Sequence, residues 1–172
     1  DRWQAQMRDA WRDPRALLAY LDLDPDAFAL SGEDDFGFLV TRAFAARMRP
    51  GDPADPLLRQ VLPVAAESRA VAGFDDDPVG DGASRGSRGV LHKYAGRALL
   101  VATGACPIHC RYCFRRAFDY ATNRLDRAHL QAAVDFIAER PDIREVILSG
   151  GDPLMLATAR LRAIGDALAA IP

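Results

Sequence analysis

The sequence predicts an α/β protein, namely the first strand–helix units of a partial (β/α) barrel preceded by a mostly helical N-terminal region. Continuous apolar runs at residues 97–103 and 146–148 each precede a helical pattern, and this order is typical of parallel strands joined by crossovers. The first ninety residues instead show short helical patterns interrupted by prolines. Two strand–helix units cannot close a sheet, so we expect a fragment that holds part of a barrel.

Helix starts in residues 1–72 are marked by capping side chains. Asp13 and Asp55 each precede a proline, which suits the first helical position. Thr41 can cap a helix that runs to Met48 and stops at the following Pro-Gly pair. Isolated helices of this length are marginal in water, so we expect them to pack against other parts of the chain.

A stretch rich in Asp, Gly and Ser separates this region from the rest. Residues 73–89 contain three consecutive aspartates at 75–77, but no ladder of metal ligands follows them. We therefore interpret the stretch as a solvated linker or wrapping arm. The predicted organisation is a helical region at 1–72, this linker, and the N-terminal portion of a barrel at 90–172.

The barrel portion is read from hydrophobic periodicity. The continuous run at 97–103 predicts a strand buried on both faces, and 146–148 predicts a second, short buried strand. A helical pattern over 130–138 ends before Pro141. A second helical pattern fills the end of the chain, with Thr158 as a candidate cap.

Composition excludes several classes of protein. The net charge of −2 gives no overall attraction to nucleic acid or anionic membranes. No apolar run reaches the roughly 18 residues of a membrane span, and the first residues lack the order of a secretory signal. All three cysteines lie in one loop, which does not fit a secreted disulfide framework. We therefore expect a cytoplasmic protein with neither nucleic acid nor membrane as a partner.

The cysteine loop carries the clearest chemistry. Cys106, Cys110 and Cys113 fall within eight residues, and three thiolates so close together can hold a soft metal or an iron–sulfur cluster. Buried structural cysteines would not explain such clustering in a polar, arginine-rich loop. Zinc completed by His109 is the rival, although His109 directly precedes Cys110 and could share one tetrahedral ion only awkwardly. A [4Fe-4S] cluster with three protein ligands would leave one iron open to a small molecule.

The spacing Cys-x3-Cys-x2-Cys, with Tyr112 before the last cysteine, resembles the signature of the radical S-adenosylmethionine (radical SAM) superfamily. The resemblance implies a [4Fe-4S] cluster on the three cysteines and S-adenosyl-L-methionine (SAM) on the open iron, beside Tyr112. A reductant such as flavodoxin or ferredoxin would supply the electron that cleaves SAM into methionine and a 5′-deoxyadenosyl radical. A second loop resembles the family's glycine-rich loop, which receives the methionyl amino group; it comprises Ser149, Gly150, Gly151 and Asp152. Taken alone, that loop is only a turn signal.

Two further stretches, 91–97 and 113–116, resemble the lysine 2,3-aminomutase family, whose radical moves an amino group held on pyridoxal 5′-phosphate. The resemblance implies that Lys93 and Tyr94 line that cofactor and that Arg97 binds its phosphate. It implies that Arg115 grips the substrate carboxylate, a role suited to the guanidinium fork. The lysine that anchors pyridoxal phosphate belongs to the C-terminal half in that family, so no catalytic residue is assigned here.

Within that family, the stretches 55–63, 73–78 and 89–94 resemble the branch that serves elongation factor P. The resemblance implies conversion of free L-α-lysine to (R)-β-lysine, which a separate ligase attaches to elongation factor P. A homo-oligomer is among the expected associations, and the fragment itself is expected to be inactive. The alternatives are a radical SAM enzyme without pyridoxal phosphate, an aminomutase for another amino acid, and a zinc-binding interaction module.

Overall fold

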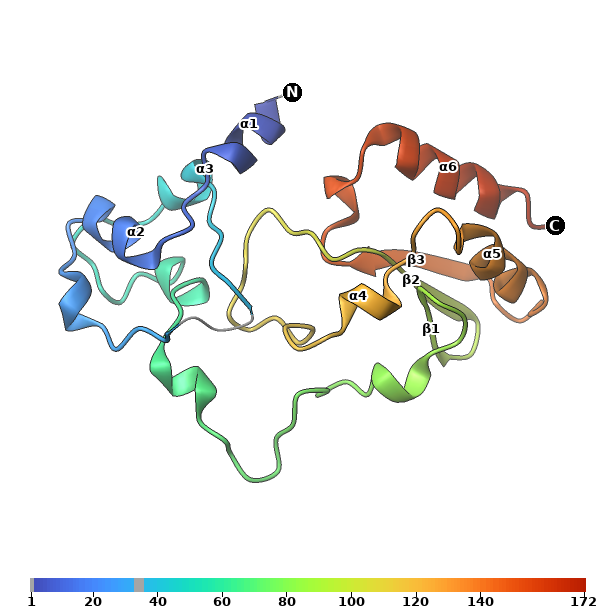
Figure 1. Cartoon of the computed structure of the whole chain (residues 1–172), viewed down its shortest axis with the longest axis horizontal. Coiled ribbons are helices and arrows are strands. Elements are labelled where there is room, and N and C mark those ends of the chain that lie inside the picture. Colours follow the sequence, from blue (N-terminus) through green and yellow to red (C-terminus); the bar gives the residue numbers. More distant parts are fainter. Residues whose placement is uncertain (1, 33–35) are drawn as a thin grey trace. The chain divides into compact units, whose positions relative to one another are not determined.

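The computed structural model describes residues 2–32 and 36–172 (Figure 1). The chain forms two compact units. The N-terminal unit comprises Asp1–Asp76 together with Pro107–Ala117, and the β/α unit comprises Asp77–Cys106 together with Phe118–Pro172. The segment 107–117, which carries most of the cysteine loop, is therefore grouped with the helical region. The domain limits predicted from the sequence, at 72 and 89, stay a prediction.

The N-terminal unit consists of short helices around one apolar core. Its α-helices and 3₁₀ turns are α1 (Arg2–Arg8), α2 (Pro14–Tyr20), η1 (Pro25–Ala27), α3 (Arg42–Ala45), η2 (Leu58–Gln60) and η3 (Ala65–Ser68). Leu17 and Leu18 of α2 are fully buried, together with Leu58 and Val61. Ile108 of the cysteine loop packs against this core. Short helices that would be marginal alone are thus stabilised by a shared apolar cluster.

The predicted caps are largely confirmed. The carboxylate of Asp13 accepts a hydrogen bond from the Arg15 amide at 2.8 Å, and Thr41 Oγ1 accepts one from the Phe44 amide at 3.4 Å. The helix predicted to run from Thr41 to Met48 is wrong in length, because α3 ends at Ala45 and irregular turns follow. The chain bends there so that Met48 can enter the core.

The β/α unit is built on one mixed sheet in the order β1-β2-β3. Its strands are β1 (Val90–Tyr94), β2 (Arg97–Thr103) and β3 (Glu145–Gly150), accompanied by η4 (Gly82–Ser84), α4 (Tyr120–Asn123), α5 (Leu130–Ala138), η5 (Pro153–Met155) and α6 (Thr158–Ala169). Strands β2 and β3 pair in parallel, with Leu99 opposite Ile147, as predicted. Strand β1 was not predicted, and it pairs antiparallel to β2 across a tight turn in which Gly96 has a φ of 80°.

Helices α5 and α6 cover one face of this sheet (Figure 1). Alternate residues of β2, including Leu100, pack with Ile137 of α5 and Ile164 of α6. The strand at 146–148 was predicted to be buried, and this is wrong at Ile147, whose side chain is 38% exposed on the opposite face. The predicted cap Thr158 is also wrong, because it is the first residue of α6 and Ala157 takes the cap position.

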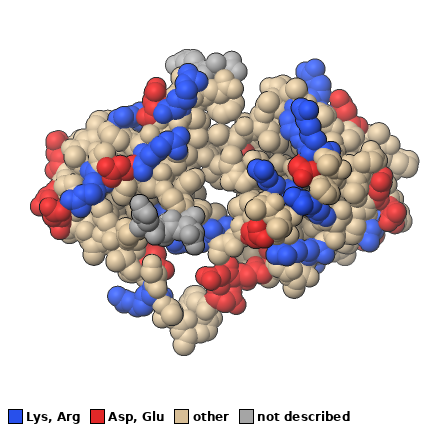
Figure 2. Space-filling view, viewed as in Figure 1, with Lys and Arg blue, Asp and Glu red and all other residues tan. Residues whose placement is uncertain are grey.

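The predicted fold class is confirmed: a mixed α/β arrangement with two parallel strand–helix units follows a helical region. Acidic and basic side chains are interspersed on the face seen in Figure 2, as the net charge of −2 leads one to expect. Among the described residues, no helix has the length and apolarity needed to cross a membrane.

Candidate functional site: the cysteine loop and the glycine loop

The cysteine loop follows β2 and contains all three cysteines, which are partly exposed and form no disulfide. Cys106 closes one stretch of the β/α unit, whereas Cys110 and Cys113 belong to the N-terminal unit. The Cys113 amide donates a hydrogen bond to the Cys110 carbonyl at 3.1 Å, which makes a turn of this part of the loop. Over residues 2–32 and 36–172, the structure gathers no three His, Cys, Asp or Glu side chains into a metal-binding group.

The chemistry of the donor set nevertheless fits an iron–sulfur cluster. Three thiols lie within eight residues, none is used in a disulfide, and none is fully buried. Thiolates are the preferred ligands of such clusters, and partial exposure leaves room for a further ligand. The cluster assignment of Cys106, Cys110 and Cys113 therefore stays a prediction that rests on donor chemistry and spacing.

The N-terminal unit holds the second half of the loop through backbone hydrogen bonds. The amide of His109 donates to the Leu39 carbonyl at 2.9 Å, and the amide of Arg111 donates to the Gln60 carbonyl at 2.8 Å. Tyr112 lies between the last two cysteines with its side chain 71% exposed, and its hydroxyl is 3.4 Å from Oε1 of Gln60. The ring of Tyr112 is thus accessible beside Cys113, although the structure does not test its predicted cofactor role.

The glycine loop meets the start of the cysteine loop within the β/α unit. The Gly151 amide donates to the Thr103 carbonyl at 2.7 Å, and the Asp152 amide donates to the Ala105 carbonyl at 2.8 Å. Thr103 ends β2, and Ala105 directly precedes Cys106. The glycine loop and the start of the cysteine loop therefore meet at the carboxyl ends of two parallel strands, where α/β folds place their ligands.

Both glycines of this loop are required by the close approach of the two backbones. A Cβ atom on Gly150 would lie 2.2 Å from the Thr103 carbonyl oxygen, and one on Gly151 would lie 2.3 Å from that of Ala105. Gly150 also has a φ of 110°, a conformation that side chains disfavour. Glycine is therefore required at both positions for more than a turn, because any side chain would push the glycine loop away from the backbone of residues 103–105.

Asp152 and Ser149 flank the glycines in different ways. Asp152 caps η5, and its Oδ1 accepts a hydrogen bond from the Leu154 amide at 2.9 Å. Ser149 lies in β3 opposite Val101 of β2. The Asp152 carboxylate thus has a local structural role, and contact with a methionyl ammonium stays a prediction for it.

The residues predicted to bind pyridoxal phosphate lie at the other end of the sheet. Lys93 and Tyr94 end β1 and Arg97 begins β2, whereas Thr103 at the far end of β2 leads into the cysteine loop. Six residue steps along a strand span about 20 Å. Arg97 forms an ion pair with Glu145 at 3.0 Å on the surface. Lys93 donates to the Val79 carbonyl, and its ammonium is 5.7 Å from the centroid of the Tyr94 ring.

The structure therefore does not bring Lys93, Tyr94 and Arg97 to the end of the sheet that carries the two loops. An exposed arginine already paired with a carboxylate is not arranged here to receive a phosphate. Their assignment to pyridoxal phosphate stays a prediction from the resemblance.

Arg115, the predicted ligand of the substrate carboxylate, is largely buried in the N-terminal unit, with 7% of its surface exposed. Its guanidinium carbon lies 4.7 Å from the centroid of the Phe114 ring. Stacking on an aromatic face restricts the guanidinium to one orientation. The structure does not test its binding of a substrate.

His109 provides no support for a zinc site. Its ring stacks with Phe36 at 5.3 Å between centroids, and burial lowers the pKa of the imidazole below its usual value. Its Nδ1 has no hydrogen-bond partner among the described residues. A neutral imidazole can be a metal ligand, but His109 joins no three-membered ligand group within the described parts of the chain.

Sequence reasoning missed Glu67, a carboxylate of η3 that contacts two arginines of the cysteine loop. Nη2 of Arg111 lies 2.6 Å and Nη1 of Arg116 lies 2.9 Å from Oε2 of Glu67. Burial alone would raise the pKa of Glu67, but hydrogen bonds from Arg111, the Val64 amide and Arg116 outweigh it, so the pKa lies below the usual range. An isolated glutamate 44 positions before Arg111 gives no signal in a single sequence.

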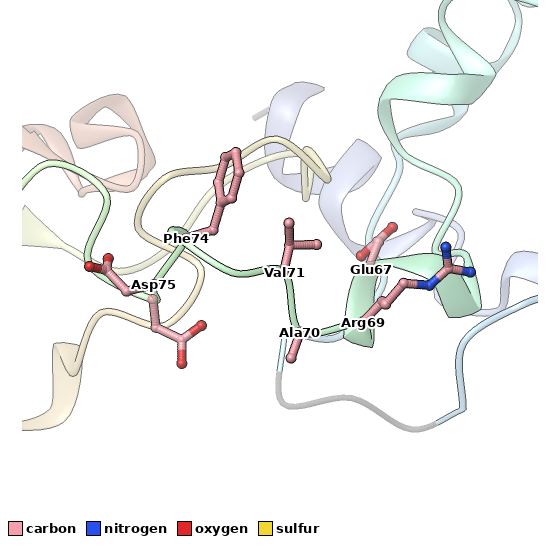
Figure 3. Close-up of a pocket in the computed structure, with 7 residues that line it drawn as sticks. Glu67, Arg69, Ala70, Val71, Phe74 and Asp75 are labelled. Atoms are coloured by element: carbon pink, nitrogen blue, oxygen red, sulfur yellow. The ribbon is translucent and has the colours of Figure 1, made fainter.

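Glu67 also borders a cavity of the N-terminal unit with a volume of about 570 Å³ (Figure 3). Figure 3 shows Glu67 and Arg69 at the end of η3, and Val71 and Phe74 on the segment that follows. The Val71 and Phe74 side chains are 53% and 82% exposed. None of the site residues predicted from the sequence lines this cavity.

Comparisons with known proteins find similarity over the part of the chain that contains both loops. The radical SAM superfamily matches residues 100–168, which span most of β2, the cysteine loop and the glycine loop. The chain is 42% identical to L-lysine 2,3-aminomutase of Escherichia coli over 99% of its own length and 50% of that protein. For the Haemophilus influenzae enzyme of the same name, identity is 39% over 89% of the chain and 46% of the relative.

A third relative, L-lysine 2,3-aminomutase of Buchnera aphidicola, is 35% identical over 98% of the chain and 51% of its own length. The chain thus spans about half the length of the curated relatives it matches. The radical SAM match and the alignment over nearly the whole chain agree with the predicted resemblance. Residues 100–168 are similar to the radical SAM superfamily, and the chain is similar over most of its length to about half of several L-lysine 2,3-aminomutases.

Proposed function

We propose that this chain supplies the radical-generating part of a radical SAM aminomutase that acts on lysine. One observation carries the proposal: within the β/α unit, the Gly151 and Asp152 amides bind the backbone that leads directly into Cys106, so the glycine loop lies against the start of the cysteine loop. The relatives named L-lysine 2,3-aminomutase support the reaction class and the substrate.

In this proposal the three cysteines hold a [4Fe-4S] cluster and leave one iron for SAM. When bound and reduced, the cluster supplies one electron to SAM, which breaks into methionine and a 5′-deoxyadenosyl radical. Gly150 and Gly151 keep the glycine loop against the cysteine loop, and backbone carbonyls there suit the methionyl ammonium. Arg115 orients the lysine carboxylate through its guanidinium, which the Phe114 ring restrains.

The finer assignments extend the proposal by resemblance. We propose that the complete enzyme uses pyridoxal phosphate, contacted by Lys93, Tyr94 and Arg97, and that its product is (R)-β-lysine for elongation factor P. Three cysteines in one loop that form no disulfide support a reducing compartment such as the cytoplasm. A reductant of the flavodoxin or ferredoxin class would serve the cluster.

Anaerobic reconstitution of the complete protein that carries this sequence tests the cluster. We expect iron and sulfide to load in equal amounts with a broad visible absorbance, and a variant with all three cysteines changed to alanine to lack it. A single tightly bound zinc without that absorbance would support an interaction module instead.

The substrate is tested separately with the reduced, SAM-loaded protein. Offered a mixture of amino acids, it should convert L-lysine to a β-amino acid of the same mass, detected by chromatography against a β-lysine standard. Conversion of another amino acid with lysine untouched would keep the radical chemistry and exclude lysine as the substrate.

A further inference from the structure

The cysteine loop lacks regular secondary structure between the end of β2 and α4, so its side chains must be positioned by contacts. Backbone hydrogen bonds at His109 and Arg111 account for the middle of the loop. The ends of the stretch 111–116 meet at a single side chain, the carboxylate of Glu67. These groups all belong to the N-terminal unit.

Glu67 is a nearly saturated acceptor. Its Oε2 lies 2.9 Å from Nε and 2.6 Å from Nη2 of Arg111, and 2.9 Å from Nη1 of Arg116. Its Oε1 accepts from Nε of Arg111 at 3.1 Å and from the Val64 amide at 3.2 Å. The fork-like contact with Arg111 fixes direction as well as distance.

The two arginines bracket a cluster ligand in the sequence. Arg111 directly follows Cys110, and Arg116 lies three residues after Cys113. Nη1 of Arg111 also donates to the Gly37 carbonyl at 3.1 Å, which anchors the same guanidinium a second time. One carboxylate therefore restrains the backbone on both sides of Cys113.

Burial makes this arrangement sensitive to loss of the carboxylate. The Glu67 side chain is 14% exposed and that of Arg111 is 6% exposed, whereas Arg116 is 31% exposed. Removing Glu67 would take away a buried negative charge that contacts both guanidinium groups, and breaking a buried ion pair in this way is strongly destabilising. The loop would then relax toward solvent, and the neighbouring thiols would move with it.

From this geometry we propose that Glu67 is the positioning residue of the cysteine loop, holding Cys110 and Cys113 in place through Arg111 and Arg116. The inference rests on the proposed function in that the thiols are cluster ligands. The Glu67 charge also compensates two cations next to the cluster ligands, and a cluster's reduction potential depends on nearby charge. Glu67 thus contributes to keeping the potential low.

The test uses the reconstituted complete protein with Glu67→Gln, which keeps the shape and removes the charge, and Glu67→Asp, which keeps the charge. For Glu67→Gln we expect iron retention against a chelator to fall by about 10-fold or more, as for loss of an outer-sphere partner. The midpoint potential of the cluster should become more positive, and the paramagnetic resonance spectrum of the reduced cluster should change. Glu67→Asp should restore the potential at least in part.

The matched control is Asp55→Asn, which also neutralises a buried carboxylate of the N-terminal unit. Asp55 is 3% exposed, and it accepts hydrogen bonds from the Leu57 and Leu58 amides at 2.9 Å rather than from the cysteine loop. We expect this variant to unfold at lower temperature with an unchanged cluster potential and spectrum. A purely structural role for Glu67 would make the two variants behave alike.

Arg116→Gln keeps the inference testable if Glu67→Gln does not fold. Loss of a cation should move the midpoint potential in the opposite direction, toward more negative values. The role of Glu67 would be overturned if Glu67→Gln kept the iron retention, the cluster midpoint potential and the paramagnetic resonance spectrum of the wild type. An unchanged midpoint potential in Arg116→Gln would also overturn it. Failure of the wild-type protein itself to load iron and sulfide would instead overturn the proposed function.

Discussion

Gly151→Ala is the sharpest perturbation of the contact between the two loops. The new Cβ would lie 2.3 Å from the Ala105 carbonyl oxygen and 2.8 Å from its carbonyl carbon. A tolerable carbon–oxygen contact is about 3.3 Å, so the loops must separate by about 1 Å. Because the obstruction is backbone on both sides, no side-chain rotation can relieve it.

That separation would break the hydrogen bonds that join the loops. The Gly151–Thr103 bond of 2.7 Å and the Asp152–Ala105 bond of 2.8 Å would lengthen beyond hydrogen-bonding range. Two lost backbone bonds cost about 1–3 kcal/mol, and residual overpacking adds a comparable amount where relaxation is incomplete. We expect the free energy of unfolding of the β/α unit to fall by about 2–6 kcal/mol.

The assay is denaturant unfolding followed by circular dichroism, with Gly165→Ala as the control. Gly165 lies within α6, and a Cβ there meets no atom within 4 Å. The same substitution should therefore stabilise α6 by up to about 1 kcal/mol. If Gly151→Ala left the free energy of unfolding unchanged while Gly165→Ala raised it, the close approach of the loops would be refuted.

The remaining predictions concern a carboxylate, an aromatic ring and an exposed ion pair. Burial alone would raise the pKa of Asp55, but hydrogen bonds from three backbone amides outweigh it and the pKa lies below its usual range. The stability that Asp55 contributes is therefore present above its unfolded pKa of about 3.9, and it is lost as the pH falls through the pKa of the folded state. Asp55→Asn should then make the free energy of unfolding depend less on pH in the acid range. Tyr112→Phe removes one 3.4 Å contact between the exposed ring and Gln60, so the free energy of unfolding should change by less than about 0.5 kcal/mol. Tyr112→Ala removes the ring itself and should weaken SAM binding, measured by calorimetry. Arg97→Ala breaks a pair with Glu145 in which both side chains are 54% exposed, so stability should change by less than about 1 kcal/mol, whereas bound pyridoxal phosphate, read by absorbance, should fall.

Each of these has an outcome that contradicts it. An unaltered acid slope in Asp55→Asn would show that its amide bonds do not control the titration. Unchanged SAM affinity in Tyr112→Ala would remove that ring from the cofactor site. Full pyridoxal phosphate occupancy in Arg97→Ala would agree with the position of Arg97 at the far end of β2 and would reject its phosphate role.

Local signals in the sequence predicted the elements whose formation depends on neighbouring residues. The continuous apolar run identified β2 at Arg97–Thr103, and helical periodicity identified α5 at Leu130–Ala138. Asp13 and Thr41 were recognised as caps because a cap satisfies amides only two or three residues away. The same local reasoning failed for α3, whose length depends on how Met48 enters the core.

The candidate site likewise combines features that depend on neighbouring residues with features that depend on distant ones. The spacing of the cysteines and the Gly-Gly-Asp stretch are local patterns, and they predict radical SAM chemistry from neighbouring residues alone. The pairing of β1 with β2 and the contact between the Gly151 amide and the Thr103 carbonyl depend on residues far apart in the chain. Such contacts become visible only once the sheet has brought the strand ends together.

By itself, then, the sequence determined the fold class and located the cysteine loop and the glycine loop, because each is encoded by residues within a few positions of one another. Only the tertiary structure decided that residues 107–117 pack with the N-terminal helices, that Glu67 binds Arg111 across 44 positions, and that Lys93 and Arg97 lie away from the two loops. The physical reason is that burial and ion pairing select partners by position in space, and spacing along the chain does not determine that position.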